Sequence, residues 1–441
     1  MANRLETLSG WGRFPVARCP VAEPSDRAAA ARAVAESGPF APRGLGRSYG
    51  DAALNPRGVL STLRLDRMID FDPESGALTC EAGVSLADIV ATFLPRGWFP
   101  AVTPGTKFVT VGGMIAADVH GKNHHRDGSF SSCLEWVDLA LADGRVARCS
   151  RRENPALFAA TCGGMGLTGL VLAARFRLRP VETDRIRQET LLAPDVDAAM
   201  ELFDASRDWT YSVAWIDCLA TGGALGRSIL YRGEHARRDE LSVPRDLFPL
   251  RRRTLRVPCD APSAALNRWS VRAFNEVYWR RARPGAEIVG VEPFFYPLDA
   301  VLGWNRVYGS GGFLQWQCAL PRAAGREGLR ALLGRIAASG RASFLAVLKG
   351  FGAGGGGPLS FPVEGWTLAL DFKADPAVLG LLSELDAVVA DHGGRLYLAK
   401  DARMSAALLR SGYPALAEFQ AQRRARGAAK FSSLLSQRLG L

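Results

Sequence analysis

The spacing of apolar positions changes period many times along the chain. Apolar residues alternate with polar ones in four short segments, which predicts strands at 60–65, 68–72, 78–81 and 170–178. A further alternating pair of segments flanks Asp143-Gly144, a dipeptide typical of a tight turn, and predicts a hairpin from Val137 to Cys149. The first part of the chain is therefore rich in short strands.

Helical patterns interrupt these strands. An alanine-rich segment predicts a helix from Ser25, its cap, to about Glu36, and Ser85 is placed to cap a second helix over 86–94. The pair Asn154-Pro155 is typical of the start of a third, short helix. Strands and helices interleave without a regular βαβ series, so the pattern favours an α+β fold over a doubly wound parallel sheet.

The character of the sequence changes near Pro180. Residues 181–400 contain most of the tryptophans, the longest loops and a glycine run at 350–357, and the last 40 residues show further helical patterns. We expect three parts: an N-terminal domain over 1–180, a second domain over 181–400, and C-terminal helices over 401–441 that return to the first domain.

Composition narrows the class of protein. Hydrophobic residues make up 48% and charged residues 22% of the 441 residues, which excludes intrinsic disorder and fibrous structure. The eight cysteines form no C-x-x-C pair, and neither a secretory h-region nor a membrane-spanning apolar segment is visible. These features predict a reduced, cytoplasmic enzyme-sized protein.

The net charge of +11 comes almost entirely from arginine. Only six of the 55 basic residues are lysines. A lysine can lose its proton when it is desolvated and an arginine cannot, so each lysine is a candidate for acid–base chemistry. The basic residues are spread along the chain without a nucleic-acid-binding motif, so we expect no nucleic-acid partner.

Three glycine-rich segments fall in the first 170 residues. They are Arg43–Asp51 (RGLGRSYGD), Pro104–Gly113 (PGTKFVTVGG) and Cys162–Gly169 (CGGMGLTG). Glycine lets backbone N–H groups approach an anion without a Cβ in the way. Three such segments suggest an extended ligand that carries a diphosphate.

Two other interpretations of these segments are weaker. Gly164, Gly166 and Gly169 form a literal G-x-G-x-x-G, but a predicted helix precedes it and a strand follows it, the reverse of a Rossmann site. His120 and His124 have the spacing of zinc ligands on a helix, but Gly121 argues against a helix there. We therefore expect no metal, and interpret the histidines as a polar wall beside a ligand or as structural loop residues.

Together these segments resemble the decaprenylphosphoryl-β-D-ribose 2′-oxidase family, within the vanillyl-alcohol-oxidase/p-cresol-methylhydroxylase superfamily of flavoproteins. The strings RGLGRSYGD and HGKNHH, in this order and spacing, are specific to that family, and the similarity runs from about residue 10 to the C-terminus. Further similar segments are 157–169, 312–317, 343–352 and 396–403.

The resemblance implies a two-subdomain FAD-binding module and a cap domain with an antiparallel sheet and flanking helices. It also implies which residues bind FAD: Arg43, Gly44, Gly46, Arg47, Ser48, Tyr49, Gly50, Gly105, Thr106, Thr110, Gly112, Gly113, His120, Gly121, Lys122, Gly164, Gly166 and Gly169. The implied substrate pocket consists of Lys122, Trp215, Phe313, Gln315, Gln317, Val347, Lys349, Phe351 and Thr367.

Some of these expectations also rest on the residues themselves. Gln315 and Gln317 share one face of a predicted strand, where paired amides can bind sugar hydroxyls, unless this is an outward polar edge. Lys349 ends an apolar predicted strand and, if it faces inward, needs an anion or a polar partner.

Oxidation of a secondary alcohol by flavin requires hydride transfer to N5, a proton acceptor and positive charge near the reduced ring. Lys400 is our first candidate for one of the last two roles, and a surface ion pair is the alternative interpretation. His120 and Tyr49 are rival proton acceptors.

Two positions depart from the family pattern. Superfamily members that link FAD covalently often have histidine where this chain has Arg47, so we predict non-covalent FAD. The family often reads Trp-Asn-x-Cys where this chain reads Trp366-Thr367-Leu368-Ala369. This second departure leaves no thiol at that position, and the prediction that it affects most is the identity of the substrate.

The resemblance implies oxidation of the 2′-hydroxyl of a polyprenylphosphoryl-β-D-ribose, the first step of epimerisation to an arabinan precursor in cell wall biosynthesis. An NAD(P)H-dependent ketoreductase would complete the epimerisation. The alternative is the same chemistry on a soluble polyol, aldonolactone or other sugar. Arginines and aromatic residues over 251–283 predict a lid with peripheral membrane contact, or else a solvated helix whose aromatic residues lie in the core.

Overall fold

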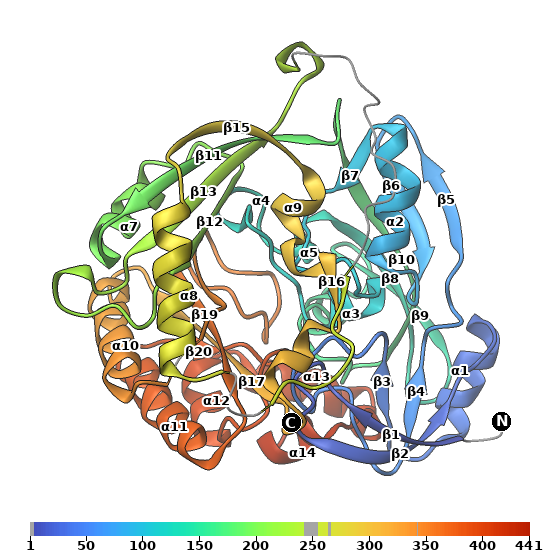
Figure 1. The fold of residues 1–441 in the computed structure, drawn as a ribbon. Helices are drawn as coiled ribbons and strands as arrows, with labels where there is room; N and C mark the ends of the chain where they lie inside the picture. Colours follow the sequence, from blue (N-terminus) through green and yellow to red (C-terminus); the bar gives the residue numbers. More distant parts are fainter. Residues whose placement is uncertain (1–3, 242–254, 263–265, 342) are drawn as a thin grey trace.

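The computed structural model describes residues 4–241, 255–262, 266–341 and 343–441. Within these residues the strands form four sheets, and the chain combines mixed α and β structure around them (Figure 1). The two N-terminal sheets and the large central sheet surround the cavity described below. The segment Arg251–Arg253, part of the predicted lid, lies outside the described residues.

The strands of the first sheet all lie between residues 4 and 61. In the described residues it has the order β1-β2-β4-β3, with β1 and β2 antiparallel and β4 parallel to both neighbours. Its strands are β1 (Arg4–Ser9), β2 (Val16–Ala22), β3 (Ala41–Arg43) and β4 (Val59–Ser61). The alanine-rich helix α1 (Arg27–Glu36) packs its small buried side chains in the same core as Phe40 and Leu60.

The second sheet is antiparallel and is centred on the long strand β10 (Leu170–Pro180). The other strands are β5 (Met68–Asp72), β6 (Ala77–Glu81), β7 (Trp98–Pro100), β8 (Leu134–Ala140) and β9 (Val146–Ser150). The helices of this region are α2 (Leu86–Phe93), α3 (Val111–Ala116), α4 (His124–Asp127), α5 (Phe130–Cys133) and α6 (Pro155–Thr161). Apolar residues of α2, α3 and α6 share one core with this sheet.

The third sheet is fully antiparallel, and its described strands all lie between residues 185 and 396. Its order is β15 (Gly285–Gly290), β11 (Arg185–Ala193), β13 (Ser228–His235), β12 (Tyr211–Ile216), β18 (Ala346–Phe351), β19 (Gly365–Lys373), β17 (Phe313–Pro321) and β20 (Arg395–Leu396). Short strands β14 (Leu255–Arg256) and β16 (Val301–Leu302) pair separately. We call the third sheet the cap sheet.

Helices cover one face of the cap sheet and leave the other toward the N-terminal sheets (Figure 1). The covering helices are α7 (Val196–Asp204), α10 (Gly325–Ser339) and α11 (Pro376–Asp391). On β17 the alternation decides which side chain faces which way: Leu314, Trp316 and Cys318 enter the core with these helices, and Gln315 and Gln317 face the cavity. Helices α8 (Arg268–Arg281) and α9 (Val291–Phe295) complete this region.

The C-terminal segment contacts the N-terminal sheets. It contains α12 (Ala406–Gly412), α13 (Leu416–Ala425) and α14 (Leu434–Leu439). Phe431 pairs with Phe40 as an isolated bridge, and Asn55 Nδ2 donates to the backbone oxygen of Ser432 at 2.7 Å. Arg438 forms an ion pair with Asp51, at the end of the first glycine segment, at 2.9 Å.

Most local predictions are confirmed. The hairpin of β8 and β9, the Ser85 cap and the helix after Asn154 are all present. The strand predicted over 60–65 is wrong beyond Ser61, where the chain turns instead. The predicted Ser25 cap is also wrong: Asp26 caps α1, because its carboxylate accepts from the Ala29 N–H, and Ser25 donates to Asp26.

Candidate active site

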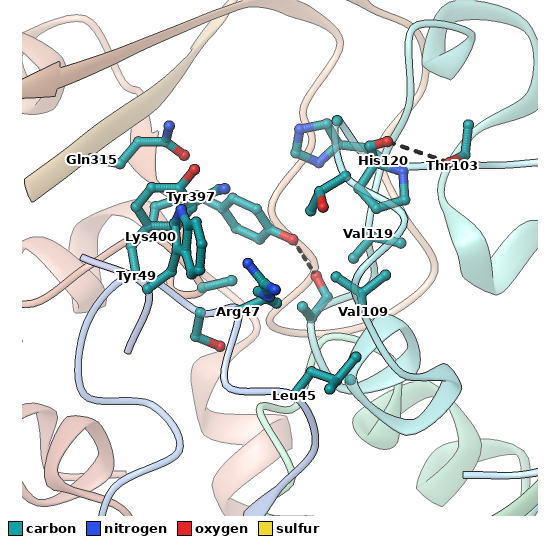
Figure 2. Close-up of a pocket in the computed structure, with 18 of the residues that line it drawn as sticks. Leu45, Arg47, Tyr49, Thr103, Val109, Val119, His120, Gln315, Tyr397 and Lys400 are labelled. Carbon is teal, nitrogen blue, oxygen red and sulfur yellow. Dashed lines mark hydrogen bonds between the residues drawn. The ribbon is translucent and has the colours of Figure 1, made fainter. Parts of the chain in front are cut away.

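One large cavity lies between the glycine segments and the open face of the cap sheet. Its volume is about 440 Å³. Arg47, Tyr49 and Lys400 approach it from one side and Val119 and His120 from the facing side (Figure 2). The predicted residues that line it are Arg43, Gly44, Gly46, Arg47, Ser48, Tyr49, Gly105, Thr106, Thr110, Gly112, Gly113, His120, Gly121, Lys122, Gly166, Gly169, Trp215, Gln315, Gln317, Val347, Lys349 and Lys400.

Backbone, rather than side chains, forms the wall at the first glycine segment. A Cβ on Gly44 would lie 2.2 Å from Thr110 Oγ1, and Gly46 has a positive φ of 65°. Thr110 is held in turn, because its Oγ1 accepts from the Gly113 N–H at 3.2 Å as the cap of α3. These contacts require glycine and bring two segments that are distant in sequence into one wall.

Two arginines lie under this wall and differ in their partners. Arg43 donates to the backbone oxygen of Ser9 at 2.8 Å and so holds the loop to β1. Arg47 instead lies over the Trp11 ring, with its Cζ 4.0 Å from the ring centroid. Burial lowers the pKa of both guanidinium groups, which means that each charge is only partly solvated. A bound anion would offset the cost of desolvating the charged guanidinium group of Arg47.

Three of the six lysines line the cavity. Burial, together with the charge of Lys349, lowers the pKa of Lys122 to about 7. Burial lowers the pKa of Lys349 to about 8. Burial also lowers the pKa of Lys400 to about 7, with Asp371 opposing the shift and Lys349 adding to it. The cavity therefore combines positive charge with amines that release a proton near neutral pH.

Lys400 lies against Tyr49. Its Nζ is 3.9 Å from the centroid of the Tyr49 ring, and the Tyr49 N–H donates to the backbone oxygen of Ala399 at 3.0 Å. The first glycine segment and the loop that carries Lys400 are thus fixed to each other. Burial raises the pKa of Tyr49 well above its usual value, so its phenol stays protonated.

His120 is oriented by an amide from the cap sheet. Gln317 Nε2 lies 3.2 Å from His120 Nε2 and 3.0 Å from Thr367 Oγ1. An amide N–H donates, so this arrangement makes Nε2 the acceptor and leaves the buried Nδ1, which has no partner among the described residues, as an N–H. Burial lowers the pKa of His120 well below its usual value. The ring is therefore neutral.

Five predicted residues do not line the cavity. Gly50 and Gly164 pack against backbone oxygens, where a Cβ would lie 2.0 Å from Asp401 O and 2.1 Å from Ala160 O. Phe313 and Phe351 form a second layer, in edge contact with Tyr49 and His120. Thr367 lies behind Gln317 and donates to the Cys318 oxygen at 2.8 Å, so its hydroxyl is already occupied.

Several cavity residues were missed by the sequence analysis. Trp11 lines the cavity and precedes Ser25, in a segment where the sequence analysis named no helix or strand. Asp299 connects the region after the cap strand β15 to the second glycine segment, because it accepts from Thr106 Oγ1 at 2.7 Å and from the Lys107 N–H at 2.8 Å. Tyr397 lines the cavity and donates to the Ala117 oxygen at 2.8 Å. A signal for Tyr397 did exist, since it precedes Lys400 by three residues in a segment that resembles the family.

His120 and His124 lie with ring centroids 6.4 Å apart, and the described residues contain no group of three or more potential metal ligands. No helix in the described part of the chain has the length and apolar character needed to cross a bilayer.

Comparison with known proteins decides the family. The sequence profile of an FAD binding domain matches residues 19–150. Decaprenylphosphoryl-β-D-ribose oxidase of Mycolicibacterium smegmatis is 37% identical over 429 residues, which are 93% of this chain and 92% of that protein. The chain belongs to the decaprenylphosphoryl-β-D-ribose oxidase family. It is thus an FAD-dependent oxidoreductase, as the sequence analysis predicted.

Two further relatives show how far the similarity extends along the chain. An uncharacterized protein of Streptomyces coelicolor is 37% identical over 373 residues, 81% of this chain and 100% of that protein. The human Delta(24)-sterol reductase is 29% identical over 120 residues, 27% of this chain and 23% of that protein. Similarity within the oxidase family therefore extends over the cap sheet, and similarity to the reductase covers only a segment.

The cavity fits FAD on the evidence of its own residues. The wall at Gly44 and Gly46 is one that a Cβ would fill, and Gly105 has no heavy atom within 4 Å of its Cβ position, so it opens onto the cavity. Arg47 supplies a partly buried cation that forms no ion pair within 4 Å among the described residues. These residues can hold the diphosphate, and Tyr49, His120, Gly121 and Lys122 can border the ring system.

Proposed function

We propose that this protein oxidises the 2′-hydroxyl of a polyprenylphosphoryl-β-D-ribose to a ketone, using FAD that is bound without a covalent link. The observation that carries the proposal is one continuous cavity that is lined by the glycine wall, by three lysines and by two glutamines of the cap sheet. We further propose that the first two sheets are the FAD-binding module and the cap sheet is the substrate-binding domain, with the C-terminal helices returning to the module.

Lys400 is the group best suited to take the hydroxyl proton. Its pKa of about 7 leaves a large fraction of neutral amine at physiological pH. Tyr49 is a poor acceptor because burial raises its pKa, and His120 is a poor one because Gln317 occupies its acceptor nitrogen. FAD, when bound, supplies the acceptor for the hydride of the carbinol carbon. The alcohol thus loses a hydride and a proton, and the proton stays on Lys400.

Polar groups of the cap sheet are suited to a phosphorylated sugar. Gln315 and Gln317 face the cavity from β17 and can bind hydroxyls, and Lys349 faces it from β18. Lys122 lies on the FAD side. The two lysines would bind the phosphodiester that lies next to the reacting hydroxyl, and each gains stability in its charged form when the anion is present.

The wall toward α8 is suited to the lipid part of the substrate. Trp215, Val347 and Tyr278 line the cavity there, and Tyr278 belongs to α8. Also on α8, Trp269 is 68% exposed and Phe274 is 44% exposed, so the alternative interpretation that the aromatic residues lie in the core does not hold for these two. Exposed aromatic residues beside helical arginines favour contact with an anionic membrane surface.

Sedimentation with vesicles tests this membrane contact. We expect the protein to sediment with vesicles of an anionic phospholipid at low salt, and the variant Trp269→Ala to do so less. Val146→Ala is a matched control, since Val146 is also exposed (53%) but lies on β9. Absence of binding at low salt would exclude the contact.

A second candidate function is the same oxidation on a soluble polyol, aldonolactone or other sugar. The supporting observation is the altered wall at β19: Thr367 is turned to Gln317 and Cys318, and Ala369 lines the cavity with a small side chain. This wall gives the substrate no polar contact from either residue.

One experiment separates the two candidates. Purified protein, loaded with FAD and kept anaerobic, is mixed with polyprenylphosphoryl ribose analogues, free pentoses, alditols and aldonolactones, and bleaching of the flavin absorbance is followed. We expect the ribose phosphodiesters to bleach it fastest. If a soluble polyol or lactone is faster, the second candidate is correct. A ketone product would require a separate NAD(P)H-dependent ketoreductase to form the arabinose epimer, and we propose such an enzyme as the pathway partner.

A further inference from the structure

A buried carboxylate lies directly behind the cap wall of the cavity. Asp371 on β19 is fully buried and stands opposite Gln315 in the β17–β19 register. Gln315 Nε2 donates to Asp371 Oδ1 at 2.5 Å, and the Tyr308 hydroxyl donates to Oδ2 at 3.5 Å. Asp371 does not line the cavity itself, so it can affect a bound sugar only through its neighbours.

Asp371 differs in its partners from two other buried acids of this protein, Asp51 and Asp386. Asp51 pairs with Arg438 and Asp386 pairs with Arg403, both through the guanidinium group. Asp371 has only neutral side-chain donors, and the described ion pairs within 4 Å do not include it. A buried carboxylate without an adjacent cation is costly, so its charge acts on whichever cation is nearby.

The cation that responds to Asp371 is Lys400. The charges of Asp371 on β19 and Lys349 on β18 act on its amine, and the ring of Tyr49 lies 3.9 Å from its Nζ. Asp371 raises the pKa of Lys400, whereas Lys349 lowers it.

The carboxylate next in sequence does not take this place. Asp401 is turned away from the cavity toward Arg438, at 2.9 Å. Asp371 is therefore the carboxylate, among the described groups, that opposes the loss of the Lys400 proton.

We propose that Asp371 is a positioning residue for the reaction: it fixes the Gln315 amide at the cavity wall and its negative charge stabilises the ammonium that Lys400 becomes. This inference rests on the proposed role of Lys400 as the proton acceptor. Asp371 acts here in its ionised form, and because burial raises its pKa to about 7, its charge is fully present only above that pH. The hydroxyl proton passes to the Lys400 amine, and the carboxylate balances the new positive charge from behind the wall.

Titration of Lys400 by NMR tests this without any substrate. Lysine labelled with ¹³C at Cε gives few signals because the chain has only six lysines. The Lys400 signal is assigned as the one lost in Lys400→Met. In the FAD-loaded protein we expect Asp371→Asn to lower the Lys400 pKa by about one unit, since an opposite charge is removed. An unchanged titration would overturn the inference.

Two further variants make the result specific. Asp386→Asn removes another buried carboxylate, one that accepts from Trp316 Nε1 at 2.9 Å, and should not shift Lys400. Tyr308→Phe removes a donor that favours ionised Asp371 and should shift Lys400 downward by a smaller amount. Its ring still stacks on Phe313, with centroids 4.3 Å apart, so this variant decides the matter if Asp371→Asn does not fold.

The pH profile of flavin reduction gives a second readout. In Asp371→Asn, we expect the apparent pKa of kcat/KM to move down together with the NMR titration. If the titration moves and the profile does not, Asp371 has no role in turnover. If ribose phosphodiesters fail to reduce wild-type flavin, the proposed function fails, but the Lys400 titration still decides whether Asp371 controls that lysine.

Discussion

The two sides of the cavity are built in different ways. On the FAD side, backbone at Gly44, Gly46 and Gly105 forms the wall, and side chains mainly hold loops to one another. On the cap side, strands β17 and β18 present Gln315, Gln317 and Lys349 through their period-two alternation. The FAD side depends on glycines, which have no Cβ. The cap side depends on the amide and amine groups of its side chains.

This difference predicts two classes of variant. Added atoms at the close-packed glycines of the FAD side should weaken cofactor binding, because the wall has no space for a Cβ there. Removed groups on the cap side should reduce turnover and leave the bound flavin in place. Lys400 is the critical case, since it lies against Tyr49 of the FAD side and responds to Asp371 of the cap.

The largest effect is expected for Lys400→Met. Loss of the proton acceptor should slow anaerobic flavin reduction by about 10²- to 10⁴-fold. The flavin absorbance of the purified variant should stay near that of wild type. Lys430→Met is the control, because Lys430 donates to backbone oxygens of Val34 and Ala35, away from the cavity. Near-normal reduction by Lys400→Met would exclude both candidate roles of this lysine.

A substitution on the FAD side should have the opposite signature. In Gly44→Ala, the new Cβ would lie 2.2 Å from Thr110 Oγ1, so either the loop or the start of α3 must shift. We expect FAD affinity to fall by about tenfold or more, equivalent to about 1–3 kcal/mol of strain. Flavin content and a titration of apoprotein with FAD measure this. Gly38→Ala is the matched control, with no heavy atom within 4 Å, and a normal affinity in Gly44→Ala would refute the close-packed wall.

The pH dependence should identify which form of Lys400 is active. As a proton acceptor it must be neutral, and its pKa is lowered to about 7. The kcat/KM for flavin reduction should therefore fall about tenfold for each pH unit below that pKa and level off above it. A rate that instead falls as the pH rises through 7 would show that the ammonium form is needed and that Lys400 supports the flavin charge.

The FAD side is more predictable from sequence than the cap. Glycine-rich segments can be recognised directly in the sequence. Because lysine is scarce, the sequence also draws attention to Lys122, Lys349 and Lys400. The shared face of Gln315 and Gln317 also follows from alternation along a strand. Gly50 and Phe313 were expected to line the site but lie behind the cavity wall, because spacing along a strand or loop does not distinguish a wall residue from one that supports it.

Other contributors could not be found from local pattern. Asp371 is one polar residue within an apolar strand, and its importance comes from Gln315 and Lys400, which are distant in sequence. Asp299 likewise acts through a contact with Thr106 across 193 positions. A carboxylate gains such a role only when the fold sets its desolvation and its neighbours, and neither quantity is a property of its own segment.

The smallest predicted effect concerns a residue that belongs to both sides. Trp11 lies under Arg47, and its ring is in edge contact with Trp304 of the cap at 5.8 Å. Trp11→Phe keeps an aromatic face but weakens the cation–π contact, which is worth about 0.5–1 kcal/mol at exposed sites. FAD affinity should fall by about two- to fivefold.

Because the same ring supports the cap, KM for the sugar should rise by a similar factor in Trp11→Phe. Val16→Ala, exposed on β2 of the same sheet, controls for general loosening. If FAD affinity changes and KM does not, the two sides of the cavity are independent. A parallel change in FAD affinity and KM would show that the N-terminal loop around Trp11 couples the two sides of the cavity. The division into a backbone wall and a side-chain wall does not by itself predict such coupling.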